Sequence, residues 1–264
     1  MQRQRIYNSH VLQYEDAGTG PAVVLLHGFG ETGGIWGFQK DCLEKSFRLL
    51  IPDLPGSGGS ALPADMSIES LARAVHFMLQ EEGIERCAMI GHSMGGYVAL
   101  AFADLYAGML SGLGLFHSTA YADSDEKKST RQKGMQFMRA HGALAFLKTA
   151  IPNTYNPATK EKAPALIEQQ LEDASNFSAE ALIQYYTAMI QRPDRTAWLR
   201  DTTLPVLFIM GRHDSAVPMA DSLAQCHLPQ LAYIHVLDDS GHMGMVEEPE
   251  QSNAFLHRFL SETA

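Results

Sequence analysis

The chain has few cysteines, only three among 264 residues. Cys42, Cys87 and Cys226 lie far apart and form no C-x-x-C pair. This spacing argues against a zinc site and against a disulfide framework, because both need paired or clustered thiols. An odd, sparse set of cysteines is typical of a reducing compartment. We therefore expect a cytoplasmic protein with buried thiols.

Positive charge is also scarce. The chain carries 20 Lys and Arg residues against 30 Asp and Glu, a formal net charge of −10. An acidic surface disfavours nucleic acid and anionic membranes as partners. No apolar run is long enough to span a bilayer, and residues 1–7 lack the apolar core of a secretory signal. We expect no membrane partner, and the oligomeric state stays open between monomer and dimer.

Apolar residues, by contrast, make up 45% of the chain and include several short unbroken runs. Such runs are typical of strands that are buried on both faces of a sheet. They fall at residues 22–26, 48–53, 87–90, 110–116, 205–210 and 232–237. Helix-compatible segments lie between several of them, including an amphipathic one at 67–82 with Ser67 as its N-cap. This alternation predicts an α/β fold with a mostly parallel sheet and right-handed crossovers.

The strand pattern stops after His117. Residues 123–191 are richer in Lys, Glu, Gln and Met, and they show helical periodicity interrupted by prolines. Ordinary helix lengths predict about four helices in this stretch. The segment is therefore expected to be a helical insertion into the sheet domain.

The most informative motif lies at residues 91–96, which read Gly-His-Ser-Met-Gly-Gly and follow an apolar run. A serine with glycine two positions before and two after it, between a strand and a helix, is the pattern of a nucleophile elbow. The chain reverses so sharply there that side chains at the flanking positions would collide with neighbouring backbone. Ser93 is therefore predicted to be a covalent nucleophile.

A serine hydroxyl needs a base to take its proton, and the base needs an acid to fix its tautomer. Functional groups of a parallel sheet gather at the carboxyl ends of the strands. Asp214 and His242 follow closely on the last two apolar runs, so we expect them to supply the acid and the base. Asp238 and Asp239 lie on the same loop as His242 and are interpreted as turn formers.

Taken together, these motifs resemble the α/β-hydrolase fold superfamily along nearly the whole chain, and the order serine, aspartate, histidine is that of this superfamily. The matching segments are Leu26-His27-Gly28-Phe29-Gly30, Asp53-Leu54-Pro55-Gly56-Ser57-Gly58-Gly59-Ser60, the elbow, Gly211-Arg212-His213-Asp214 and Ser240-Gly241-His242. The resemblance implies a doubly wound hydrolase core at residues 1–117 and 199–264. It also implies a helical cap, or lid, at residues 118–198.

The resemblance further implies an oxyanion hole formed by the backbone N–H groups of Phe29 and Met94. His27 is expected to have a structural role beside that loop, and His92 to occupy the variable position of the elbow. Asp53 is interpreted as a loop or helix-capping residue.

Substrate contacts are harder to predict. We expect Phe137, Met138 and Phe146 of the cap to face the substrate, although most such residues on an amphipathic helix pack the cap itself. His117, at the end of the 110–116 run, either lines the pocket or is a partly buried hinge residue.

A competing interpretation concerns Gly28, Gly30 and Gly33, which with Asp53 come close to a dinucleotide-binding fingerprint. The strand before these glycines is preceded by two others, whereas that fingerprint normally opens its domain. The interpretation also leaves the serine, aspartate and histidine unexplained. The chain has no H-E-x-x-H motif and no His/Cys cluster with ligand spacing. We therefore expect neither a cofactor nor a metal.

The expected function is that of an enzyme, a serine hydrolase that cleaves a small or medium, largely apolar carboxylic ester through an acyl-enzyme. Its partner would be a small-molecule acyl substrate. Serine instead of aspartate at position 93 disfavours haloalkane dehalogenase and epoxide hydrolase chemistry. Lactonases, carbon–carbon bond hydrolases and cofactor-free perhydrolases remain as alternatives, because a fold does not fix the reaction. A receptor-like binding protein with vestigial turnover is a further one.

Overall fold

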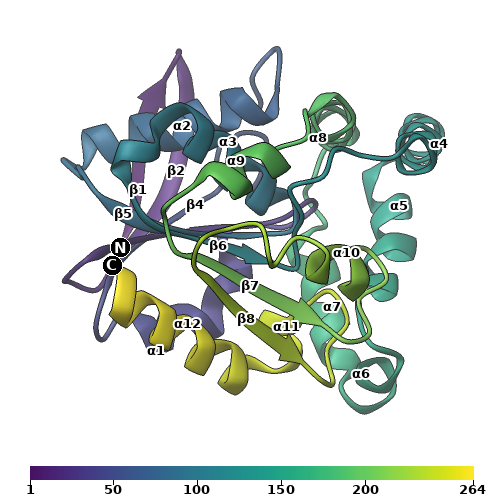
Figure 1. The fold of residues 1–264 in the computed structure, drawn as a ribbon. Coiled ribbons are helices and arrows are strands. Elements are labelled where there is room, and N and C mark those ends of the chain that lie inside the picture. Colours follow the sequence, from purple (N-terminus) through teal and green to yellow (C-terminus); the bar gives the residue numbers. More distant parts are fainter.

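The computed structural model describes residues 1–264 and contains one eight-stranded sheet with helices on both faces (Figure 1). The strands are β1 (Gln2–Tyr7), β2 (His10–Ala17), β3 (Ala22–Leu26), β4 (Arg48–Pro52), β5 (Cys87–His92), β6 (Leu110–Phe116), β7 (Val206–Gly211) and β8 (Ala232–Leu237). Their order is β1-β2-β4-β3-β5-β6-β7-β8, and only the β1–β2 and β2–β4 pairs are antiparallel. The predicted mostly parallel α/β fold is therefore confirmed.

Helices cover the sheet in two layers. Helices α2 (Ile68–Glu81) and α3 (Met94–Tyr106) lie on one face, and α1 (Gly37–Leu43) and α12 (Pro249–Thr263) lie on the other (Figure 1). Every residue of β3, β5, β6 and β7 is buried. This double burial explains why these strands read as unbroken apolar runs. None of the helices combines the length and the apolar character needed to span a membrane.

Local sequence signals fix several of these elements. Helix α2 begins after Ser67, whose hydroxyl accepts a hydrogen bond from the Ser70 N–H while the Ser70 hydroxyl accepts one from the Ser67 N–H. This reciprocal capping box satisfies two backbone donors that the helix cannot pair internally. Strands β1 and β2 are joined by Asn8 and Ser9, both with positive φ, as two-residue hairpin turns of this kind require.

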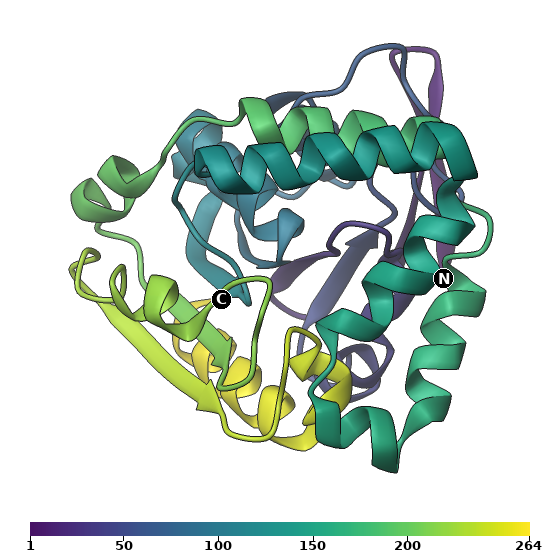
Figure 2. The ribbon, with the colours of Figure 1, turned by 90° about the vertical axis from the view of Figure 1, so that its right-hand side faces the viewer.

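The chain between β6 and β7 is mostly helical, and most of it lies at the carboxyl end of the strands, toward which the arrowheads of β6, β7 and β8 point (Figure 1). Its helices are α4 (Asp125–His141), α5 (Ala143–Ala150), α6 (Pro157–Lys162), α7 (Pro164–Asp173), α8 (Ala179–Gln191) and α9 (Thr196–Asp201). Helices α4 and α8 pack side by side (Figure 2). The expectation of about four helices within 123–191 was too low, because Pro157 and Pro164 each start a helix.

The turn from β5 into α3 has an unusual backbone. Ser93 lies between the two elements with φ 50° and ψ −115°, a conformation that costs free energy for a residue with a side chain. A Cβ atom at Gly95 would overlap the carbonyl oxygens of Leu26 and His27, and one at Gly91 would overlap the backbone of Gly95. The glycines are therefore required because the start of α3 presses against the ends of β3 and β5.

We predict that Gly95→Ala destabilises the protein by about 3 kcal/mol or more, because the new methyl group meets backbone atoms that cannot move independently. Gly108→Ala is the matched control, since no atom lies within 4 Å of a Cβ at that position. Urea unfolding of both variants measures the difference. Equal unfolding midpoints would contradict the proposed crowding at Gly95.

Candidate active site

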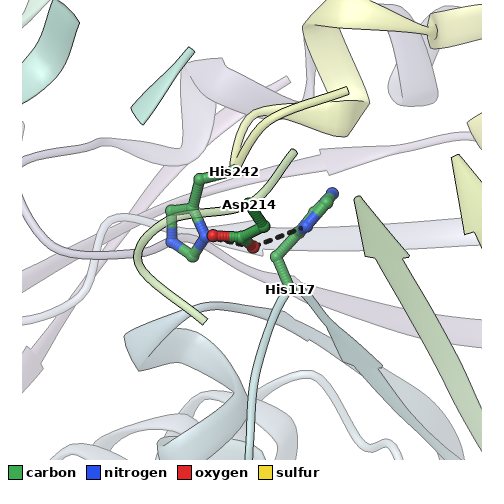
Figure 3. A group of neighbouring side chains, drawn as sticks. All are labelled: His117, Asp214 and His242. Carbon is green, nitrogen blue, oxygen red and sulfur yellow. Dashed lines mark hydrogen bonds and ion pairs between the residues drawn. The ribbon is translucent and has the colours of Figure 1, made fainter. Parts of the chain in front are cut away.

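The elbow, the loop after β7 and the loop after β8 bring the three predicted catalytic residues together at the carboxyl edge of the sheet. Ser93 and His242 line one cavity of about 460 Å³. Asp214 lies behind His242, and its Oδ2 accepts a hydrogen bond of 2.8 Å from His242 Nδ1 (Figure 3). His242 Nε2 has no partner within the protein, Ser93 included. The ring is therefore held at one nitrogen and free at the other.

Asp214 is buried and its carboxylate is fully used. Its Oδ1 accepts the backbone N–H groups of Ala216 and Val217, each at 2.8 Å, and its Oδ2 accepts His242 and His117. Burial opposes ionisation, but the histidines outweigh it and hold the pKa of Asp214 well below its ordinary range. Burial likewise opposes the charged form of His242, and the Asp214 carboxylate outweighs it and raises the pKa of His242. The pair is thus arranged to stabilise an imidazolium at His242.

His117 is the second histidine on Asp214. It ends β6 with φ 48°, and its Nδ1 lies 3.0 Å from Asp214 Oδ2 (Figure 3). Burial lowers the pKa of His117 to about 4, so the ring is neutral at pH 7 and its single proton is best placed on Nδ1. His117 does not line the cavity. The side chain is completely buried and bonded to the acid, a position that the sequence did not predict.

The two backbone N–H groups expected to form an oxyanion hole, those of Phe29 and Met94, have no partner within the protein. The Phe29 N–H donates no hydrogen bond within the chain, and Phe29 lines the same cavity as Ser93. Met94 is the first residue of α3, where a helix offers its N–H no internal acceptor. Both N–H groups are therefore available to an oxygen atom beside Ser93.

The residues expected to face the substrate from the helical segment are not among those that line the cavity. Phe137 is 41% exposed and packs against His141, while Met138 is only 1% exposed. Phe146 packs edge-on against Phe29 and Tyr186. None of the three lines the cavity.

The cavity instead meets the first two turns of α4 and parts of α5 and α8. The residues of the helical segment that line it are Ser124, Glu126, Lys127, Thr130, Arg131, Leu147, Ala150, Ile151, Thr154, Gln170, Tyr186 and Met189. The prediction favoured apolar side chains in the second half of α4. In the structure the polar first half of that helix reaches the cavity, and such residues look like an ordinary solvent-exposed face in sequence.

Glu31 and His92 form a buried pair that the sequence did not reveal. Glu31 Oε2 accepts the Gly28 N–H at 2.6 Å and lies 2.9 Å from His92 Nδ1. His92 Nε2 lies 2.9 Å from the carbonyl oxygen of His242. Both ring nitrogens thus face acceptors, so the pair shares a proton beyond the single one of a neutral imidazole. His92 is therefore a connector between two loops, whereas the motif alone suggested a variable position.

The charge of this pair follows from its surroundings. Burial opposes ionisation of Glu31, but His92 and the Gly28 N–H outweigh it and lower the pKa of Glu31. The Glu31 carboxylate is therefore ionised at neutral pH although it is buried.

Glu247 connects the helical segment to the histidine loop. Its Oε1 accepts the Asn156 N–H and the Thr159 hydroxyl, both at 2.8 Å. Its Oε2 accepts the N–H groups of Gly241 and Met243. The His242 N–H itself donates to the Thr154 carbonyl oxygen. The position of His242 therefore depends on the turn at residues 154–159.

The residues of the alternative dinucleotide fingerprint have other partners. Asp53 accepts the N–H groups of Gly33 and Gly59, which fixes two loops. His27 Nδ1 donates to the Gly28 carbonyl oxygen, and its Nε2 accepts the Leu54 N–H. Both side chains therefore shape the loops around the cavity, as a structural role requires.

Three possible metal ligands, His117, Asp214 and His242, lie within 4.8 Å of one another. The Nδ1 atoms of both histidines already bond to the Asp214 carboxylate. A cation at this point would have to displace both protons, and the cluster is accounted for as a hydrogen-bonded network.

We predict that Glu31→Gln destabilises the protein by about 1–3 kcal/mol at neutral pH, because it removes a buried, ionised carboxylate that accepts the Gly28 N–H and faces His92 Nδ1. The lowered pKa of Glu31 means that its contribution is complete above the unfolded carboxyl pKa of about 4.3 and is lost as the pH falls through the folded value. The difference in Tm between wild type and variant should therefore shrink in acid. Exposed Glu168 supplies the control, Glu168→Gln, and a difference independent of pH would refute the role assigned to the ionised carboxylate.

Comparison with known proteins shows which sequences and structures this chain resembles. The chain matches the model of the alpha/beta hydrolase family over residues 23–255. It is 29% identical to the pimeloyl-[acyl-carrier protein] methyl ester esterase of Methylococcus capsulatus, and the match covers 94% of this chain and 97% of that protein. A malate-bound thermophilic esterase from Thermogutta terrifontis superposes with a TM-score of 0.93 and 29% identity, covering 99% of this chain and 98% of that one.

The enol-lactonase from Burkholderia xenovorans has the same fold, with a TM-score of 0.91 at 24% identity over 98% of this chain and all of that one. The family model matches almost the whole sequence, and the sheet order and the strained turn at Ser93 are consistent with that match. The chain therefore belongs to the alpha/beta hydrolase family.

Proposed function

We propose that this protein is a serine esterase that cleaves a carboxylic ester through an acyl-enzyme on Ser93. The observation that carries the proposal is the shared cavity. Ser93, held in a strained turn, lines it together with His242, whose other ring nitrogen is bonded to a buried carboxylate. These are the parts that a serine needs to become a nucleophile.

In the proposed mechanism, His242 Nε2 takes the proton of the Ser93 hydroxyl as the oxygen attacks the ester carbonyl carbon. The Nδ1–H···Asp214 bond fixes the tautomer that leaves Nε2 free, and the carboxylate stabilises the resulting imidazolium. The N–H groups of Phe29 and Met94 bind the oxyanion. His242 then protonates the departing alcohol, and water releases the acid by the same steps in reverse.

The cavity supports a small or medium substrate. Its volume of about 460 Å³ is in the range of small-molecule sites. Phe29, Leu147, Ile151 and Met189 give it an apolar lining. We assign residues 118–198 as a cap, since helices from this stretch form much of the wall.

The relatives support ester hydrolysis. The relative from Methylococcus capsulatus is named a methyl ester esterase, and the Thermogutta terrifontis structure is that of an esterase. The enol-lactonase is only 24% identical in sequence, so its similarity supports the fold and not the reaction. A panel of p-nitrophenyl esters, a lactone and a ring-cleavage dienoate separates these reactions in one experiment. Binding without turnover on every substrate would favour a receptor-like protein instead.

A fluorophosphonate probe should label the wild-type protein and fail to label Ser93→Ala, because the reagent reacts only with an activated serine. Labelling is read by intact-protein mass. Ser118→Ala is the control, since Ser118 also lies near the elbow but its hydroxyl donates to the Ser93 carbonyl oxygen. Equal labelling of wild type and Ser93→Ala would refute the assignment of the nucleophile.

The pH dependence should follow His242. The base must be neutral to accept a proton, so kcat/KM should rise with pH through an apparent pKa above the ordinary histidine value of about 6.5, in line with the raised pKa of His242. Asp214→Asn removes the charge that raises this pKa, so the rise of kcat/KM should occur at lower pH. The same variant should lose roughly 10⁴-fold in kcat. An unchanged profile in Asp214→Asn would contradict the role assigned to the acid.

A further inference from the structure

One buried charge cluster beside the cavity is not neutral. Asp123 is completely buried, and it contacts two guanidinium groups, Arg131 Nε at 2.6 Å and Arg192 Nη1 at 2.9 Å. Burial opposes ionisation of Asp123, but the two arginines outweigh it and lower its pKa. Arginine stays protonated in proteins. The cluster therefore carries two positive charges and one negative charge, which leaves one cation without a counter-charge.

The two arginines differ in how they are used. Arg192 is 3% exposed at its side chain, stacks on the Tyr97 ring at 3.7 Å and donates to the carbonyl oxygens of Met189 and Tyr121. Its position is fixed within the protein. Arg131 is 19% exposed at its side chain, lines the cavity, and has no hydrogen-bond partner at Nη1. The uncompensated charge is therefore available at Arg131.

Other charged groups on the cavity wall do not neutralise Arg131. Glu31 is paired with His92. Lys127 lies 3.8 Å from the carboxylate of Asp221 at the surface, and Glu126 is exposed. The Arg131 guanidinium lies over the Tyr186 ring, at 5.2 Å from its centroid, so its plane is held against one wall. A preoriented guanidinium with a free donor is a typical binding group for a carboxylate.

We propose that Arg131 binds a carboxylate carried by the substrate at the end remote from the ester bond. The substrate class is then carboxylic esters with a second, free carboxylate, such as half-esters of dicarboxylic acids. The apolar residues of the cavity would contact the chain between the two groups. This proposal rests on the proposed esterase function, and it makes that function selective for anionic esters over neutral ones of equal length.

The test compares kcat/KM for monomethyl adipate with kcat/KM for methyl hexanoate, which matches it in length but lacks the charge. A charge-assisted hydrogen bond predicts a preference of roughly 10- to 100-fold for the half-ester in the wild-type protein. In Arg131→Gln this ratio should fall to about one, mainly through a higher KM for the half-ester. Arg131→Lys should keep part of the preference, and exposed Lys133→Gln, which removes one charge from the same helix, should keep all of it.

A second variant avoids disturbing the buried cluster. Thr130 also lines the cavity and is not among the side chains bonded to Asp123, so Thr130→Glu places a negative charge on the same wall and should also abolish the preference. The acetate ester of a hydroxyhexanoate, which carries its carboxylate on the alcohol side, shows which half of the substrate reaches Arg131. No preference for either anionic ester, or a preference that survives in both Arg131→Gln and Thr130→Glu, would overturn the proposal.

Failure of the esterase function can be told apart from failure of this subsite. Calorimetry measures the binding of monomethyl adipate to Ser93→Ala and to the double variant Ser93→Ala/Arg131→Gln, where no turnover is needed. Weaker binding to the double variant by about tenfold or more supports the subsite even if wild type hydrolyses neither ester. Equal binding to both proteins overturns it.

Discussion

The close approach of three backbones around Ser93 is the constraint on which the rest of the site depends. The start of α3 touches the end of β3, and both lie against β5, so that only glycine fits at Gly91 and Gly95. This contact forces the positive φ of Ser93. It also sets the distance between the elbow and the loop after β3, which carries Phe29. Nucleophile and backbone donors are therefore positioned by the same packing.

The loops around the cavity are also held in place by buried polar groups, each of which needs a hydrogen-bond partner. Removing such a group from water without a partner costs more than an ordinary hydrogen bond returns, so the loops around the cavity are fixed by their mutual contacts. Glu31 and His92 join the loop after β3 to the elbow and to the His242 backbone. Asp214 joins the ends of β6, β7 and β8 through His117 and His242. Each loop is tied to at least one other loop.

The sheet could be predicted from the sequence because double burial leaves an unmistakable pattern. The run at 22–26 coincides with β3, and the run at 110–116 coincides with β6. The sequence also predicted that Ser93, Asp214 and His242 lie near one another, because each follows a strand and parallel strands end at a common edge of the sheet. Ser93 and His242 line one cavity and Asp214 lies behind His242, in agreement with that expectation, while the catalytic roles of the three residues stay a proposal.

The remaining features could not be predicted because they depend on contacts between distant segments. Glu31 and His92 are 61 positions apart, and neither has a sequence context that distinguishes a buried ion pair from a surface charge. Arg131 and Asp123 sit eight residues apart in a charged stretch that is typical of an exposed helix. Only the position of Arg192, which follows α8 and contacts Asp123, shows that this carboxylate is buried between two arginines.

The bonds of Glu247 have a consequence for how the helical segment can move. They fasten the turn at residues 154–159 to the loop of His242, together with the Asn156 side chain, which donates to the Asp239 carbonyl oxygen. Helix α8 is fastened to the core independently, because the Tyr185 hydroxyl contacts the carbonyl oxygens of Leu54 and Pro55. A displacement of the helical segment that kept His242 and these contacts in place would therefore leave both the turn and α8 stationary.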